Sequence, residues 1–167
     1  MIKKIFVLLF LIPVFAYGQD KEVEVGDRVP DFTFAVSKTK NANIKDYRGK
    51  YVLIVFFATW CGPCIQELPH VEEQIWKVYK NNPDFDLMVF GREHTWEEVD
   101  KFKAMKKFDM PFYPDPDRDV FAKFATKYIP RSFLIDKDGN IIYKTTGFTT
   151  EEFEKLVAKI RSDLASQ

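Results

Sequence analysis

The chain has 167 residues, of which 46% are hydrophobic and 16% aromatic, and its 25 basic and 25 acidic residues cancel to a formal charge of zero. This length and apolar content suit one domain with its own core. The balanced charge gives no electrostatic argument for binding nucleic acid or an anionic membrane surface.

The N-terminus, residues 1–18, has the pattern of a secretory signal peptide. Two lysines precede an apolar run at residues 5–16, and small residues follow it. The run is short against the ~20 residues of a membrane-spanning helix, and it contains Pro13, so a membrane anchor retained by an uncleaved signal is the less favoured alternative. Cleavage would leave residues 19–167 as a single exported domain, which we expect in the periplasm.

The first half of this domain predicts a deeply buried strand. Residues 32–37 alternate apolar and polar side chains, which indicates a half-buried strand, and a polar loop is expected over residues 38–43. Residues 51–58 are apolar without alternation, which is typical of a strand covered on both faces of an α/β sheet. We therefore expect the central strand at residues 51–58.

The middle of the chain predicts two helices separated by a strand. A helix is expected over residues 63–79, kinked at Pro69, and a strand over residues 85–90. A second, amphipathic helix is expected over residues 95–108. Its capping box and its apolar face consist of Thr95, Glu98, Val99, Phe102, Met105 and Phe108.

The last third predicts a short helix, a hairpin and a final helix. The short helix is expected over residues 119–128, after a break at residues 111–116. Strands at residues 132–136 and 141–146 flank an Asp-Gly turn, which favours an antiparallel hairpin. The final helix begins near residue 149, behind a second Thr/Glu capping pair.

Cys61 and Cys64 are the only cysteines, and they stand where the apolar strand gives way to the first helix. Two cysteines at this spacing can close a disulfide across the first turn of a helix. The unpaired backbone N–H groups and the positive dipole end there favour a thiolate. This pattern predicts a redox-active dithiol in which Cys61 is the nucleophile.

Two other interpretations of the cysteine pair are open. A purely structural disulfide would close a loop of about four residues and remove only ~2 kcal/mol of denatured-state freedom. Half of a zinc site would need further ligands, but His70 and His94 are isolated and there is no second cysteine pair. We therefore expect no metal, and no cofactor beyond the Cys61–Cys64 disulfide.

The order of elements resembles the thioredoxin fold: an α/β domain with a mixed sheet, parallel in its first half and antiparallel in its C-terminal hairpin, and with helices on both faces. More narrowly, the chain resembles TlpA/ResA-type thiol-disulfide oxidoreductases of the thioredoxin superfamily. The segments that carry the resemblance are residues 26–34, 47–50, 56–64, 67–69, 129–130 and 136–139.

The resemblance implies roles for the residues around the dithiol. Cys61 would attack a substrate disulfide, and Cys64 would resolve the mixed disulfide. Trp60 would present an apolar face to the partner, although it could also be an ordinary core aromatic. Gly62 and Pro63 match the spacer of reducing thioredoxins, with potentials near −270 mV against about −120 mV for the oxidant DsbA.

Three further sites follow from the same resemblance. Ile129–Pro130 would be a cis-proline beside the dithiol that pairs with an extended substrate segment. Glu67 would transfer protons or tune the thiol pKa values, unless it is a solvent-facing glutamate; thioredoxins place a buried aspartate where this chain has Val55. Residues 92–94 are either substrate contacts or a solvated loop.

The resulting expectation is an exported thiol-disulfide oxidoreductase that reduces cysteine-containing exported proteins. Its role would be cytochrome c maturation or general thiol repair, and a membrane thiol-disulfide donor would supply its electrons. The alternatives are a thioredoxin-fold thiol peroxidase, a disulfide-forming oxidase, and a non-catalytic binding module with a vestigial dithiol.

Overall fold

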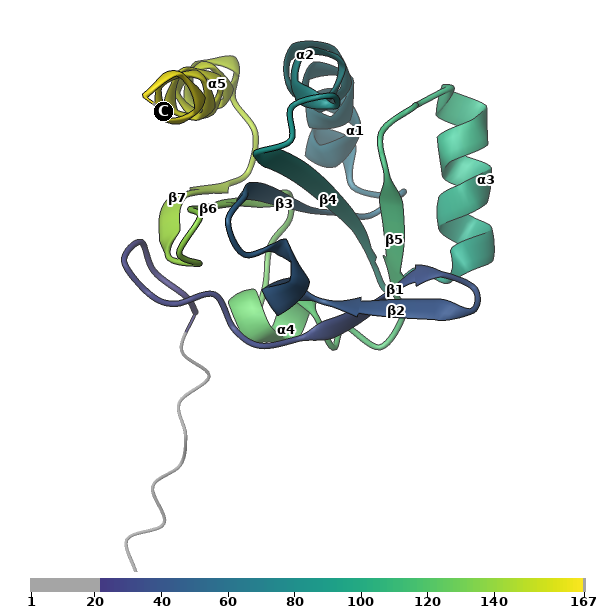
Figure 1. Cartoon of the computed structure of the whole chain (residues 1–167). Helices are drawn as coiled ribbons and strands as arrows, with labels where there is room; N and C mark the ends of the chain where they lie inside the picture. Colours follow the sequence, from purple (N-terminus) through teal and green to yellow (C-terminus); the bar gives the residue numbers. More distant parts are fainter. Residues whose placement is uncertain (1–21, 167) are drawn as a thin grey trace, which may run out of the picture.

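The computed structural model describes residues 22–166, and at its centre lies a five-stranded mixed sheet (Figure 1). β4 (Phe85–Arg92) pairs in parallel with β3 (Tyr51–Phe57), and β5 (Phe112–Asp115) pairs in parallel with β4. On the other side of β3, β6 (Arg131–Ile135) and β7 (Ile141–Thr146) add two antiparallel strands. The order β5-β4-β3-β6-β7 confirms the predicted mixed sheet and its C-terminal hairpin.

β3 is the central strand, as its sequence predicts. Every side chain from Val52 to Phe57 is almost inaccessible to solvent. An uninterrupted apolar run of this kind has no face that can meet water, so other elements must cover both sides of the sheet.

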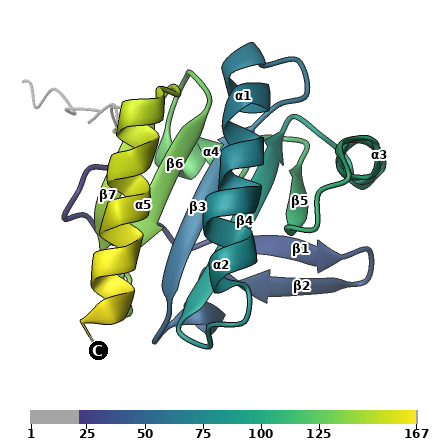
Figure 2. The same cartoon turned by 90° about the horizontal axis from the view of Figure 1, so that it is seen from above.

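One face of the sheet is covered by two long helical segments that lie side by side (Figure 2). The first comprises α1 (Gly62–His70), a π-helical stretch (Val71–Trp76) and α2 (Lys77–Tyr79), and the second is α5 (Thr150–Ala165). The predicted helix over residues 63–79 is thus present, and its hydrogen-bonding register changes directly after the turn that contains Pro69. Proline has no N–H to donate to the ladder, and such interruptions favour a wider turn.

The opposite face is covered by shorter elements (Figure 1). They are α4 (Phe121–Phe124), a 3₁₀ turn (Ile44–Tyr47), and a hairpin of β1 (Thr33–Ser37) and β2 (Lys40–Asn43). Phenylalanines of β1 and α4 and Ile44 of the 3₁₀ turn pack against β3 and β4, forming a second apolar core. Helices therefore lie on both faces, as expected.

Two segments predicted as irregular are strands, so those predictions are wrong. Lys40–Asn43, in the predicted polar loop, is β2, and Phe112–Asp115, in the predicted break, is β5. β2 is exposed over half its length and β5 is an edge strand that contains Pro114. Exposed and edge strands need little apolar alternation and tolerate proline, so the sequence carries no strong strand signal there.

α3 (Trp96–Lys106) begins with the predicted capping box, in which the Thr95 and Glu98 side chains each accept from the other's backbone N–H. The helix runs beside β5 rather than over the sheet (Figure 1). Its predicted apolar face is only partly covered: Val99 and Phe102 are buried, whereas Met105 is 65% exposed. Met105 thus belongs to the predicted apolar face but is left uncovered by the core.

The signal peptide predicted for residues 1–18 lies outside the residues that the structure describes. Within residues 22–166, no helix has the length and apolar character needed to cross a membrane.

Candidate active site

The two cysteines form a disulfide at the start of α1, with their Cα atoms 5.3 Å apart. Cys61 is the N-cap residue in extended conformation, and the Cys64 backbone N–H donates to its Sγ at 3.2 Å. Gly62 and Pro63 complete the first turn, where proline loses no helical hydrogen bond. Cys61 is 6% exposed and Cys64 is fully buried, so a partner can reach only the first sulfur.

The predicted cis-proline is confirmed, because the Ile129–Pro130 peptide bond is cis. The Ile129 carbonyl oxygen lies 3.7 Å from Cys61 Sγ. The Pro130 carbonyl accepts the Gly147 N–H at 2.9 Å, which ties this loop to the segment after β7. The backbone before Pro130 therefore borders the reactive sulfur.

A groove of about 440 Å³ adjoins Cys61 and contains the Gly62-Pro63 spacer. Trp60 borders it with 63% of its surface exposed, so Trp60 is not a core aromatic. Arg92 and Tyr128 also line the groove, and the Arg92 guanidinium carbon lies 6.0 Å from the Trp60 ring centre. Aromatic and cationic side chains thus surround the disulfide.

His94 does not lie in a solvated loop, since it is buried behind the segment that precedes Cys61. Its Nε2 accepts the Thr59 N–H at 2.8 Å, and its Nδ1 donates to the Glu93 carbonyl at 2.9 Å. Gly91 makes this packing possible, because a Cβ there would lie 3.0 Å from the His94 Cβ and 2.6 Å from a Val99 methyl. His94 therefore fixes the backbone two residues before Cys61.

Glu67 is buried, with 2% of its surface exposed, so its interpretation as a solvent-facing glutamate is wrong. Its Oε1 accepts the Ser132 hydroxyl at 3.2 Å, and its Oε2 is buried without a hydrogen-bond partner. Burial raises the pKa of the Glu67 carboxyl from 4.5 to about 7, although the Ser132 hydrogen bond opposes this. The group can therefore exchange a proton near neutral pH.

The surroundings of Glu67 explain the apolar residue at position 55. Val55 on β3 is directly opposite Ser132 on β6 in the sheet register. The buried acid thus comes from α1, three residues after Cys64, and the sheet contributes its hydrogen-bond partner Ser132, whose neighbour across the sheet is Val55. The sequence contains Glu67 but no sign of its burial, because its contact with Ser132 joins residues 65 positions apart.

The sequence does not identify Ser132 as a neighbour of the site, and for His94 it predicts only a substrate contact or a solvated loop, not the buried partner of Thr59. A Gly-x-x-His pattern at the end of a strand could have suggested a close packing of His94 on Gly91. Among residues 22–166, no group of three or more His, Cys, Asp or Glu side chains is placed to hold a metal ion.

Comparison with known proteins finds similarity over most of the chain. The model of the Redoxin family matches residues 24–160. The thiol-disulfide oxidoreductase ResA of one Bacillus cereus strain is 31% identical over 136 residues, covering 81% of this chain and 78% of that protein. The ResA of Geobacillus kaustophilus (strain HTA426) is 30% identical over 146 residues, covering 87% and 83%.

Solved structures are similar in the same way. A candidate protein disulfide isomerase from Bacteroides thetaiotaomicron is 37% identical with a TM-score of 0.81, covering 86% of this chain and 91% of that chain. A candidate thiol:disulfide interchange protein DsbE from Chlorobium tepidum is 29% identical with a TM-score of 0.75, covering 86% and 99%.

Proposed function

Because the chain belongs to the Redoxin family and is a thiol-disulfide oxidoreductase of the ResA type, we propose that it acts as an exported reductant of protein disulfides. The observation that carries this proposal is the asymmetry of the disulfide. Cys61 borders an open groove, and Cys64 is buried behind it on the same helix as Glu67. An accessible thiol that can attack, a buried thiol that can resolve the mixed disulfide, and a buried acid thus lie on the first two turns of one helix.

In the proposed reaction the reduced dithiol supplies two electrons. The Cys61 thiolate attacks one sulfur of a partner disulfide, so the partner's S–S bond breaks and its second sulfur leaves as a thiol. Cys64 then attacks Cys61 Sγ, which forms the Cys61–Cys64 bond and releases the partner's remaining thiol. The Cys64 N–H and the helix N-terminus favour the negative charge on Cys61 before attack.

Glu67 would remove the proton that Cys64 must lose before it attacks. A buried thiol is a poor nucleophile because low polarity disfavours its thiolate. A carboxyl with a pKa near 7 and an unpartnered buried oxygen is suited to accept that proton at neutral pH. Return of the proton to bulk solvent would then prepare the site for the next cycle.

The partner would dock along the groove that surrounds Cys61. An extended segment would pair with the backbone at Ile129, before the cis-proline, and its apolar side chains would contact Trp60. Gly62 and Pro63 leave the approach to the sulfur open, because both are exposed and neither carries a long side chain. These features support recognition of unfolded or extended cysteine-containing chains.

The proposed setting is outside the cytoplasm, after removal of residues 1–18, with residues 19–167 as the working domain. A dithiol there becomes oxidised unless a donor reduces it, so a membrane thiol-disulfide protein would return the electrons. The proposed substrates are apocytochromes c before haem attachment, or exported cysteine proteins in general. The Gly-Pro spacer supports the reducing direction.

The reduction potential of residues 19–167 tests this direction. Equilibration in graded thiol/disulfide buffers, read by trapping of free thiols, should give a reversible two-electron midpoint at or below about −250 mV. A midpoint near about −120 mV would instead identify a disulfide-forming oxidase. Rapid turnover of peroxide with a thiol donor would identify a thiol peroxidase.

A trapping experiment tests the partners. Cys64→Ser should stall the reaction as a mixed disulfide on Cys61, which non-reducing electrophoresis and mass spectrometry can identify. Cys61→Ser is the matched control and should trap little. Equal recovery of partners by the two variants, or none by either, would contradict the proposed order of attack.

A further inference from the structure

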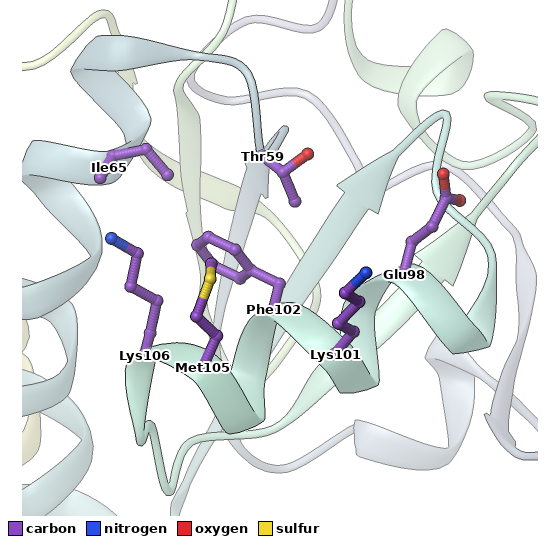
Figure 3. Close-up of a pocket in the computed structure, with 7 residues that line it drawn as sticks. All are labelled: Thr59, Ile65, Glu98, Lys101, Phe102, Met105 and Lys106. Carbon is purple, nitrogen blue, oxygen red and sulfur yellow. The ribbon is translucent and has the colours of Figure 1, made fainter.

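A second groove of about 320 Å³ lies beside the disulfide, between the start of α1 and the outer surface of α3 (Figure 3). Thr59 and Ile65 form one side, and side chains of α3 form the other. This groove has no part in the chemistry described above. Its size is at the lower end of ligand-binding pockets, about 300–1,000 Å³, and suits one or two side chains of a partner.

Two of the residues that line the groove are close in sequence to the disulfide. Thr59 is two residues before Cys61, and Ile65 is one helical turn after it, with its N–H donating to the Cys61 carbonyl at 3.1 Å. A chain whose cysteine is bonded to Cys61 therefore has this groove within reach of its neighbouring residues. An extended chain advances about 3.3 Å per residue, so residues a few positions from the substrate cysteine could reach the groove.

The floor of the groove is apolar and partly uncovered. Phe102 is buried, Met105 has most of its surface exposed, and both line the groove from α3 (Figure 3). Five large hydrophobic residues are exposed among residues 22–166, and three of them, Trp60, Tyr128 and Met105, border the two grooves beside the disulfide. Methionine adapts its shape to varied partners, which suits a surface that accepts different substrates.

The rim of the groove carries positive charge. Lys101 and Lys106 flank the apolar floor on α3, and neither side chain has an ion pair or hydrogen bond within the described part of the chain (Figure 3). By contrast, Lys103 on the same helix donates to the Asp109 carbonyl, and the rim carboxylate Glu98 is engaged by Thr95. A partner with a carboxylate next to an apolar side chain would complement this arrangement.

We propose that this groove binds the segment of the substrate protein next to its reactive cysteine, with an apolar side chain against Phe102 and Met105 and an acidic residue beside Lys101 or Lys106. This inference rests on the proposed exchange at Cys61. It predicts that substrates with an apolar and an acidic residue beside the reactive cysteine react fastest. Substrate choice then depends on residues that flank the cysteine, in addition to the redox potential.

The experiment measures second-order rate constants of the reduced protein with short peptides that contain one disulfide. One peptide carries Leu-Asp beside the cysteine, a second carries Leu-Lys, and a third carries Gly-Ser. A small aromatic disulfide reports the intrinsic reactivity of Cys61. We expect the Leu-Asp peptide to react about tenfold faster than the other two at low salt, and the advantage over Leu-Lys to shrink as salt rises.

Variants assign the preference to the groove. K101E combined with K106E should lower the rate with the Leu-Asp peptide about tenfold, raise the rate with the Leu-Lys peptide, and leave the small disulfide unchanged. M105S should remove the advantage of leucine. The matched control is K123E combined with R161E, which makes the same charge change at exposed positions on α4 and α5.

The outcomes separate this proposal from the proposed function. Equal rates for the three peptides, or equal effects of the two double variants, would overturn the groove proposal and leave disulfide exchange intact. A wild-type protein that reduces neither the peptides nor the small disulfide would overturn both.

Discussion

Two glutamates on the same helical segment, Glu67 and Glu72, are both buried, and the structure treats them differently. The two carboxylate oxygens of Glu72 accept the backbone N–H groups of Asp109 and Met110, at 3.2 and 3.1 Å. Glu67 has one partner, Ser132, and one buried oxygen without any. Glu72 therefore fastens the segment before β5 to the helix, whereas the bonding capacity of Glu67 is left incomplete.

This difference separates a structural acid from a functional one. Burying a carboxyl is costly unless its oxygens are hydrogen-bonded, so complete bonding as at Glu72 is the usual solution. An incompletely bonded acid with a pKa raised to about 7 makes the folded protein less stable when the acid is ionised. Such acids are typical of sites whose chemistry uses them. Burial alone therefore does not distinguish a functional acid from a structural one, because both glutamates are buried. The buried oxygen of Glu67 that has no hydrogen-bond partner makes the distinction.

The largest expected effect is on the structural acid. Glu72→Ala removes two charge-assisted hydrogen bonds and leaves the Asp109 and Met110 N–H groups unpaired, which should lower the free energy of unfolding by about 4 kcal/mol. Urea unfolding of the oxidised protein measures this. Glu73→Ala, at an exposed neighbour, should leave stability nearly unchanged. A similar loss in both variants would contradict the structural role of Glu72.

The pH dependence of stability should come next in size. In the unfolded chain Glu67 ionises at an ordinary pKa of 4.5, but in the folded protein it stays protonated until about pH 7. The stabilisation that protonated Glu67 gives the folded state is therefore fully present below pH 4.5. It is lost as pH rises to about 7, which lowers the free energy of unfolding by ~3 kcal/mol. Urea unfolding of wild type and Glu67→Gln across this window should diverge; parallel curves would show that the pKa of Glu67 is ordinary.

Glu67→Gln should also slow catalysis, by about 100-fold or ~2.7 kcal/mol, in the step where Cys64 resolves the mixed disulfide at pH 7. Attack by Cys61 should change less, because Cys61 borders the open groove and can lose its proton to solvent. Stopped-flow kinetics separates the two steps, and the pH-rate profile should lose its inflection near pH 7. Slowing of both steps to the same extent would show that Glu67 acts on the site as a whole.

The smallest effect concerns His94. Like Glu72 it has hydrogen-bond partners for all its polar side-chain atoms, but unlike Glu72 it bonds to the segment just before Cys61. His94→Phe removes the acceptor for the Thr59 N–H, so hydrogen exchange of that amide should speed up about tenfold, equivalent to ~1.4 kcal/mol. The Met110 amide is the internal control and should not change. If both amides accelerate equally, the effect is global and His94 does not specifically position the segment before Cys61.

The sequence predicts the parts of this molecule that local patterns encode. The dithiol at the start of α1, the central strand and the Asp-Gly hairpin follow from spacing, apolar content and turn chemistry over a few residues. The cis bond before Pro130 follows only from the family resemblance, because few X-Pro bonds are cis.

The missed features depend on distant contacts. The burial of Glu67 requires β6, and the packing of His94 on Gly91 depends on how the segment after β4 folds back. Met105 has the periodicity of a core residue, yet α3 lies beside the sheet and leaves its outer face uncovered. Helical periodicity identifies an apolar face, but the arrangement of neighbouring elements decides how much of it is covered.

The anchoring of Glu72 has a mechanical consequence for Glu67. The two acids bond to different neighbours of this helical segment, so they lie on different flanks of it. One flank is tied to the segment before β5, and the other meets β6. A helix held on one flank only could rotate about its axis and expose Glu67 to water. The hydrogen bonds at Glu72 oppose this rotation, and so they help to keep the Glu67 carboxyl buried.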